Sequence, residues 1–210
     1  MNKLIFLFAI SIVFLISCKE DTGDCADDLG TFTMLPSSIS QVPYGSVSSV
    51  VFVDTFGTEL HFTITKTEEF TVKGPIIDGP EYCYTTHQLS YLLRDDSLDI
   101  DLAVILMATP ARFSPTEVYS PDILNITYHD PNPAVVSYGV FNKILNDGGA
   151  PVNFTPNMVF DSIVILGRTF LAVEQTHYTN PHNWLVFNST EGIVAFEDDF
   201  GNRWRFERFE

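Results

Sequence analysis

An alternation of apolar and polar residues runs through much of the chain beyond residue 30 and predicts β-strands. Residues 59–65 and 203–207 alternate in this way, which is typical of a strand with one buried and one exposed face. The segment that begins at residue 98 alternates first and then becomes apolar at 103–107, so we expect it to enter a covered region. No long segment has helical spacing, although 138–145 favours one short helix. Further strands are predicted at 82–93, 123–129, 160–166 and 169–177.

One pattern of residues occurs twice, near the two ends of the predicted β region. The segment FVDTFGTELHF (52–62) aligns without gaps on FEDDFGNRWRF (196–206), and both read F-x-D-x-F-G-x-x-Φ-x-F. Aspartate accepts hydrogen bonds from the backbone of a turn, and glycine adopts the positive φ that other residues avoid. Each copy therefore predicts a β-hairpin, over 50–64 and 192–207. A duplicated unit and a turn that arose twice both remain open.

Segments rich in glycine and proline separate the predicted strands, at 74–80, 130–133 and 147–151. The chain of 210 residues is long enough for one domain with a sizeable core, which we place at 31–210. The predicted fold is all-β, a single antiparallel β domain, and both a sandwich and a strongly curved sheet fit the pattern.

The start of the chain differs from the rest and indicates a leader. Lys3 precedes an apolar run at 4–16, which is shorter than the about 20 residues of a membrane-spanning helix and suits a signal peptide. The next residues, LISC at 15–18, resemble the lipobox of bacterial lipoproteins. The resemblance implies cleavage after residue 17 and attachment of lipid to Cys18, with more than one acyl chain, as stable anchoring requires.

The segment behind Cys18 is polar and acidic, which is typical of a flexible tether at 18–30. Its residues Lys19, Glu20 and Asp21 resemble the surface-export signal of some Gram-negative lipoproteins. We therefore expect a signal peptide at 1–17 and a mature protein anchored in the bacterial outer membrane that faces the cell exterior. The periplasmic face is the alternative.

Charge and cysteine content narrow the set of partners. The formal net charge is −16, and removal of Lys3 with the leader makes it one unit more negative. Such a surface repels nucleic acids and anionic headgroups, so we expect the membrane to be a partner only through lipidated Cys18. Of the three cysteines, Cys25 and Cys83 remain as a pair in an oxidising compartment, which predicts a disulfide between tether and domain.

The C-terminal stretch NSTEGIVAFEDDFGNRWRF (188–206) resembles the closing hairpin of small β-rich bacterial outer-membrane lipoproteins of uncharacterised function. A Gly-Ile-Val strand, an acidic turn with glycine and a tryptophan strand end the chain in that group. The resemblance covers both ends of the domain and is loose in the middle. It implies an antiparallel β lipoprotein, but it implies no activity and no functional residue.

Catalytic and metal-binding motifs are missing from the sequence. The five histidines are scattered, without HExxH or HxH spacing, so we expect them to face solvent and predict neither a metal site nor a cofactor. There is no G-x-S-x-G motif, and once Cys18, Cys25 and Cys83 are assigned no thiol is left as a nucleophile. We therefore expect a protein that is not an enzyme. A glycoside hydrolase remains an alternative because carboxylates are abundant.

The remaining candidates concern binding and modification. Tyr178, His182 and Trp184 lie in a polar loop and form a candidate ligand-binding site, since exposed aromatic rings stack on sugars. Ser97 and Ser162 follow aspartates and precede apolar residues, which resembles the O-glycosylation site of some surface-exporting bacteria. The leading hypothesis is a non-enzymatic module that binds a protein or carbohydrate, or that interacts with the envelope. A carrier with an apolar pocket inside a curved sheet is the alternative.

Overall fold

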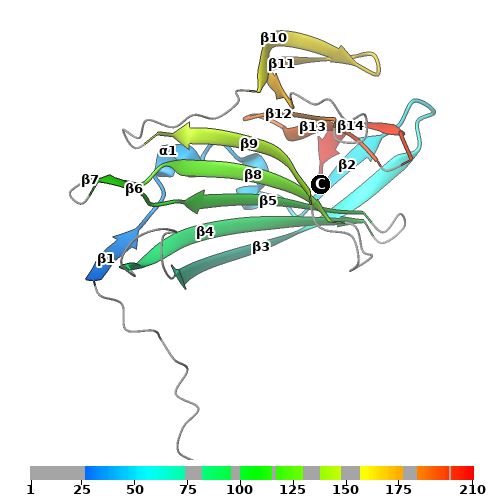
Figure 1. The fold of residues 1–210 in the computed structure, drawn as a ribbon. Helices are drawn as coiled ribbons and strands as arrows, with labels where there is room; N and C mark the ends of the chain where they lie inside the picture. Colours follow the sequence, from blue (N-terminus) through cyan, green and yellow to red (C-terminus); the bar gives the residue numbers. More distant parts are fainter. Residues whose placement is uncertain are drawn as a thin grey trace, which may run out of the picture.

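The computed structural model describes residues 27–73, 82–95, 100–114, 117–129, 138–147, 157–176, 184–198 and 200–210. These residues form mainly β-strands, and nearly all of the strands belong to one strongly curled sheet (Figure 1). The predicted all-β fold is confirmed, and of the two architectures expected the chain adopts the curved sheet.

Among the described residues, the larger sheet has 12 strands, and a separate sheet has 2. The strands of the larger sheet follow the order β10-β11-β12-β13-β14-β2-β3-β4-β5-β8-β9, with β1 beside β4. The smaller sheet consists of β6 and β7. The elements are β1 (Asp27–Phe32), α1 (Pro36–Ile39), the 3-10 helix η2 (Pro43–Ser46), β2 (Ser49–Val53), β3 (Glu59–Lys73), β4 (Tyr82–Asp95), β5 (Ile100–Ala108), β6 (Ala111–Ser114), β7 (Glu117–Tyr119), β8 (Asp122–His129), β9 (Tyr138–Asn146), β10 (Met158–Ile165), β11 (Arg168–Gln175), β12 (Leu185–Asn188), β13 (Gly192–Glu197) and β14 (Arg203–Phe209).

Strand pairing fixes which ends of the molecule lie together. The pairings between described strands are antiparallel, apart from the parallel pairing of β1 with the start of β4. Both predicted hairpins are confirmed, as β2–β3 and β13–β14. They lie side by side because β14 pairs with β2, with Arg205 opposite Val53. The turns of both hairpins are therefore at the same end of the sheet, which we call the rim.

The sheet curls until its two ends approach each other. The ring centroids of Phe141 in β9 and Phe187 in β12 lie 5.5 Å apart. The ammonium of Lys143 in β9 lies 2.5 Å from a carboxylate oxygen of Glu174 in β11. Among the described strands, β9 and β11 do not pair through their backbones. Side-chain contacts therefore hold the curl in place.

The inner face of the curl is filled with large apolar side chains. Alternate residues of the strands point inward, as the strand period of two requires. Phe52 lies at the centre of this core, with its ring centroid 5.4 Å from that of Phe62 and 5.1 Å from that of Phe196. The buried residues of β4, β5 and β8 continue the core, and they include Leu89, Tyr91, Leu93, Leu102, Val104, Leu106, Leu124 and Ile126.

The segment with α1 and η2 packs into the concave side of the sheet. Ser38 donates a 2.6 Å hydrogen bond to the buried carboxylate of Asp122, and the Leu35 amide donates one of 3.0 Å to the same oxygen. Tyr44 is buried against Tyr91, and its hydroxyl accepts a 2.8 Å hydrogen bond from the amide of Ile193. Burial raises the pKa of Tyr44 well above its usual range, so the hydroxyl stays protonated.

The β10–β11 hairpin forms a second layer over part of the sheet. Ala172 has a φ of +48°, and β11 pairs with β12 only at Glu174 and Gln175, so the rest of β11 leaves the sheet. Arg168 donates hydrogen bonds of 3.1 and 2.6 Å to the carbonyls of Phe206 and Glu207, which fasten the hairpin to β14. The hairpin stands above β12, β13 and β14 in Figure 1.

Two expectations from the sequence are wrong. The segment 138–145 is a strand, because β8 offers it a free edge and its aromatic and β-branched residues suit the sheet, with Phe141 buried in the core. His87 does not face solvent. It is buried, its ring stacks on Phe70 at 4.7 Å, and its Nε2 lies 3.0 Å from a carboxylate oxygen of Glu68.

The contact between Tyr44 and Gly192 predicts an unequal response of two glycines. Both Gly192 and Gly57 have positive φ, but a Cβ on Gly192 would overlap the Tyr44 ring and hydroxyl, whereas one on Gly57 would meet nothing within 4 Å. We expect Gly57→Ala to lower the free energy of unfolding by about 1–2 kcal/mol through backbone strain. Gly192→Ala should lower it by about 1–3 kcal/mol more through overpacking. Chemical denaturation of the full chain measures both, and equal losses would contradict the proposed contact.

Candidate functional site

The two turns at the rim have the same geometry, and an aspartate side chain holds each one. Asp54 accepts 2.8 Å hydrogen bonds from the amides of Phe56 and Thr58 through the same oxygen. Its own amide donates a 3.1 Å bond to the carbonyl of Thr58, and Gly57 supplies a φ of +84°. The residues of the repeated pattern thus close the turn for the reason expected from the sequence.

The second turn repeats these contacts. Asp198 accepts hydrogen bonds of 3.0 and 2.8 Å from the amides of Phe200 and Asn202, and Gly201 has a φ of +81°. The phenylalanine between the aspartate and the glycine cannot reach the core from this position. Phe56 is therefore 92% exposed and Phe200 is 87% exposed.

The surroundings of the two tips differ in the part of the chain that the structure describes, because the β10–β11 turn lines a cavity with the first tip, and this cavity does not include Phe200. Leu166 lies in that turn, with a φ of +45°, and its carbonyl accepts a 3.2 Å hydrogen bond from Nε of Arg205 in β14. Leu166 and Arg205 line a cavity together with the β2–β3 turn, but Phe200 is not part of the lining.

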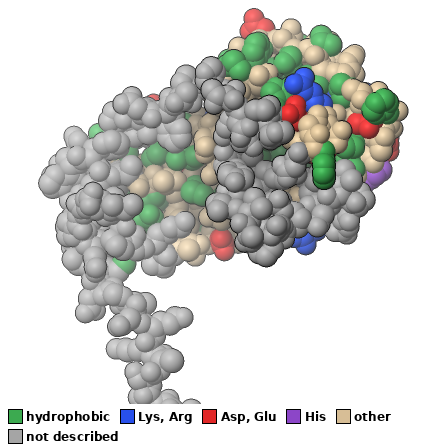
Figure 2. Space-filling view, turned by 45° about the vertical axis from the view of Figure 1, so that its right-hand side comes forward, with side chains coloured by type: hydrophobic (Ala, Val, Ile, Leu, Met, Phe, Trp, Pro, Cys, Tyr) green, Lys and Arg blue, Asp and Glu red, His purple; other side chains and the backbone are tan. Residues whose placement is uncertain are grey.

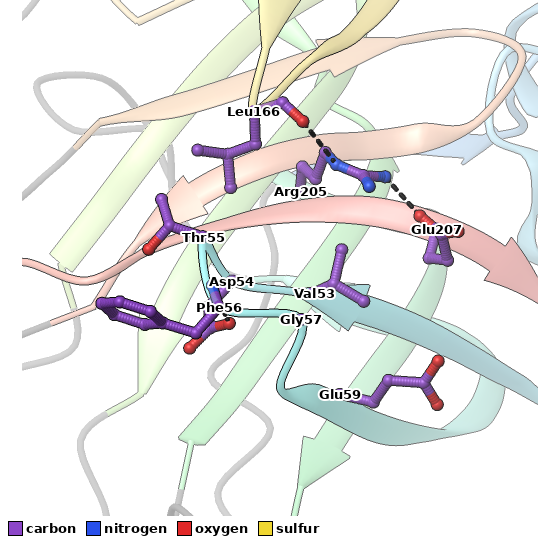
Figure 3. A pocket seen from close by; sticks show the side chains of 9 residues that line it. All are labelled: Val53, Asp54, Thr55, Phe56, Gly57, Glu59, Leu166, Arg205 and Glu207. Atoms are coloured by element: carbon purple, nitrogen blue, oxygen red, sulfur yellow. Dashed lines mark hydrogen bonds and ion pairs between the residues drawn. The ribbon is translucent and has the colours of Figure 1, made fainter.

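This rim cavity has a volume of about 550 Å³ and opens to solvent (Figure 3). Its volume lies within the about 300–1,000 Å³ that is usual for small-molecule sites. In Figure 3, Arg205 lies between the Leu166 carbonyl and Glu207, and the Phe56 ring projects from the turn away from them. The lining residues are Val53, Asp54, Thr55, Phe56, Gly57, Glu59, Leu166, Arg205 and Glu207.

The charged groups of the cavity are paired with one another or with neighbours. Arg205 forms an ion pair with Glu207. Glu59 accepts hydrogen bonds of 2.8 and 3.2 Å from the two terminal nitrogens of Arg208. On the side shown in Figure 2, a cluster of basic side chains lies beside an acidic one, with hydrophobic side chains around them.

The pKa values of two cavity carboxylates follow from these contacts. Hydrogen bonds from Arg208 lower the pKa of Glu59 below its usual value, and the charges of Arg208 and His61 act in the same direction. Desolvation raises the pKa of Asp54, but hydrogen bonds from Thr58 and Phe56 outweigh it, so the pKa is lowered overall. Both groups are therefore ionised at neutral pH and serve as hydrogen-bond acceptors.

The residues predicted to bind ligand are only partly described. Trp184 is half-buried, and the guanidinium of Arg203 covers its ring at 4.9 Å from the centroid. Tyr178 and His182 lie outside the described residues, so their meeting with Trp184 stays a prediction. Trp184 does not line the rim cavity.

The modification and anchoring residues are also only partly described. Ser162 is exposed in β10, where it is accessible for the predicted glycosylation. Cys83 lies in β4. Cys18, Cys25, the export signal at 19–21 and Ser97 lie outside the described residues, and the predictions about them remain.

Among the described ranges, no three side chains of the metal-binding types come together. Within the same part of the chain, no helix has the length and apolarity needed to cross a bilayer.

The rim cavity was missed in the sequence because its lining comes from three segments far apart in the chain. The repeated pattern predicted the two turns, and it could also have predicted the exposed rings, since a residue between the turn aspartate and glycine points away from both strands. No local pattern shows that Leu166 would reach Arg205. That contact depends on the departure of β11 from the sheet at Ala172.

Comparison of the chain with protein-family models, with curated proteins and with solved structures found no match. The rim cavity, its paired charges and the exposed ring of Phe56 are the features on which we base a function.

Proposed function

We propose that this chain is a lipid-anchored bacterial lipoprotein whose β domain is a non-enzymatic binding module, with the rim cavity as its binding site. The observation that supports binding most directly is the cavity of about 550 Å³ beside Phe56, whose ring is 92% exposed. A concave surface of this volume, lined by apolar side chains, one aromatic ring and a few polar groups, fits a small-molecule site. The anchor is Cys18 in the outer membrane, and the domain faces the cell exterior.

The position of the cavity suits a tethered protein. β1 begins at Asp27, so it includes the last four residues of the predicted tether, and it pairs with the start of β4, at the end of the sheet opposite to the rim (Figure 1). The 15 residues of β3 run from the rim to that far end, about 45–50 Å at the usual strand rise. A domain held at its β1 end thus carries the cavity away from the membrane surface, where a ligand outside the cell can reach it.

Two of the three carboxylates that line the cavity do not suit the alternative of glycoside hydrolysis. That reaction needs one carboxyl group with a raised pKa as the general acid. The pKa values of Asp54 and Glu59 are both lowered. The alternative of an apolar-ligand carrier has less support, because the rings of Phe52, Phe62 and Phe196 fill the inner face of the curl.

A disulfide between Cys25 and Cys83 is part of the same proposal. The parallel pairing of β1 with β4 sets Asp28 opposite Cys83, and Cys25 precedes Asp28 by three residues in the sequence. Three residues span at most about 10 Å, so a bridge between Cys25 and Cys83 is compatible with this register. The bridge would fasten the tether to a central strand.

Metabolic labelling with palmitate tests the anchor. We expect the wild type and Cys25→Ser to incorporate label and to sediment with membranes, because Cys25 is not in the lipobox. Cys18→Ser should incorporate none and should leave the membrane fraction. Labelled Cys18→Ser, or an unlabelled wild type, would refute lipidation at this position.

Chemical denaturation of three variants tests the bridge. Cys25→Ser and Cys83→Ser should each lower the free energy of unfolding by about 2–4 kcal/mol, since the bridge closes a long loop in the unfolded chain. The double variant should lose no more than either single variant, because both remove the same bond. Additive losses, or a wild type whose stability does not fall on reduction, would show that the two thiols are not joined.

Hydrogen–deuterium exchange tests the cavity without knowledge of the ligand. The full chain in detergent is mixed with a soluble extract of the envelope and growth medium of the producing bacterium. We expect slower exchange at 54–59 and 205–207, and unchanged exchange at the matching turn, 200–202. Protection from exchange that is confined to other segments, or no protection by the extract at all, would overturn the cavity as the binding site.

A further inference from the structure

We infer that the rim cavity binds a neutral oligosaccharide, with the ring of Phe56 against the apolar face of one sugar and with Arg205 and Glu207 bonded to the hydroxyls of another sugar of the same chain. The inference rests on the proposed function, because it names the class of ligand for the same cavity. Three properties of the site support it: the pairing of its charges, the hydrogen-bonding groups that the pairs leave open, and the position of the exposed ring.

The pairing of charges argues against an ionic ligand. Arg205 is held by Glu207 and by the carbonyl of Leu166, and Glu59 is held by Arg208. An anionic ligand would have to displace Glu207 from Arg205, and a cationic ligand would have to displace Arg208 from Glu59. A neutral ligand can bind while both pairs stay intact, whereas an ionic ligand would only exchange one solvent-accessible ion pair for another, which gains little.

The pairs still leave donors and acceptors open. Among the described residues, Arg205 uses Nε and Nη1, so the two hydrogens of Nη2 have no partner there. Glu207 uses Oε2 for Arg205, which leaves Oε1 as an acceptor in the same part of the chain. A hydroxyl both donates and accepts, and neighbouring hydroxyls of a sugar suit a donor and an acceptor held side by side.

The exposed ring supplies the apolar part of the recognition. Phe56 projects from the turn that forms one wall of the cavity (Figure 3). One face of a pyranose carries C–H groups, and an aromatic ring with 92% exposure can cover that face without rearrangement of the turn. Val53 and Leu166 add apolar surface to the same cavity.

Phe200 provides a matched control within the same chain. It occupies the equivalent position of the equivalent turn and is 87% exposed, but it does not line the cavity. Replacement of either phenylalanine by alanine removes an equally exposed phenyl ring and leaves the aspartate and glycine of the turn in place. A difference in binding between the two variants therefore reports on the cavity and not on surface hydrophobicity.

Isothermal titration of the full chain in detergent tests the inference. The neutral probes are cellohexaose, maltohexaose, laminarihexaose, mannohexaose and xylohexaose, and the charged probes are hexagalacturonate and chitosan hexamer. We expect at least one neutral probe to bind wild type and Phe200→Ala alike, with Phe56→Ala weaker by about tenfold. Binding should change little between about 0.05 and about 0.5 M NaCl, because no net charge is neutralised.

Three results would overturn the inference. They are failure of all five neutral probes to bind, binding of a charged probe alone, and equal loss of binding in the two phenylalanine variants. If the probes fail while the envelope extract still protects 54–59 from exchange, the saccharide is wrong and the binding module stands. If the extract gives no protection either, both proposals fail.

Discussion

The contact between Phe52 and Phe196, with ring centroids 5.1 Å apart, holds together the part of the molecule on which the rest depends. The two residues open the two copies of the repeated pattern, and each is fully buried on the inner face of the sheet. The pairing of β14 with β2 joins the copies edge to edge. Two hairpins anchored in one aromatic core cannot shift register independently, because a slip by one residue would turn every buried ring outward. Both turns are therefore fixed at the rim.

The shared core leaves the two tips alike, and a third hairpin makes them different. β11 leaves the sheet at Ala172, and the bonds of Arg168 to β14 hold the β10–β11 hairpin above the sheet. This brings Leu166 to Arg205 and closes one side of a cavity beside Phe56. Equivalent turns thus come to have different surroundings. At the opposite end of the sheet, β1 pairs with the start of β4.

The sequence predicted those parts of the fold that depend on local chemistry. Asp54 and Asp198 close their turns as expected, because a side-chain acceptor and a following glycine suffice to specify such a turn. The segment 138–145 was misassigned because four apolar residues fit both a helix and a strand, and only the free edge of β8 decides between them. The burial of His87 against Phe70 and the packing of Tyr44 under Ile193 depend on neighbours remote in the chain. The cavity was missed for the same reason. Lipid attachment at Cys18 and ligand binding by Tyr178 and His182 remain predictions.

The central claim is that a ligand binds beside Phe56 while the ion pairs of the cavity stay intact. A crystal structure of the chain with a bound neutral hexasaccharide tests it most directly. The account predicts one sugar ring parallel to the Phe56 ring, hydroxyls of another sugar within hydrogen-bond distance of Arg205 Nη2 and Glu207 Oε1, and an unbroken Arg205–Glu207 pair. A sugar located against Phe200, inside the curl, or on the exposed apolar residues Val164 and Leu171 of the β10–β11 hairpin would contradict it.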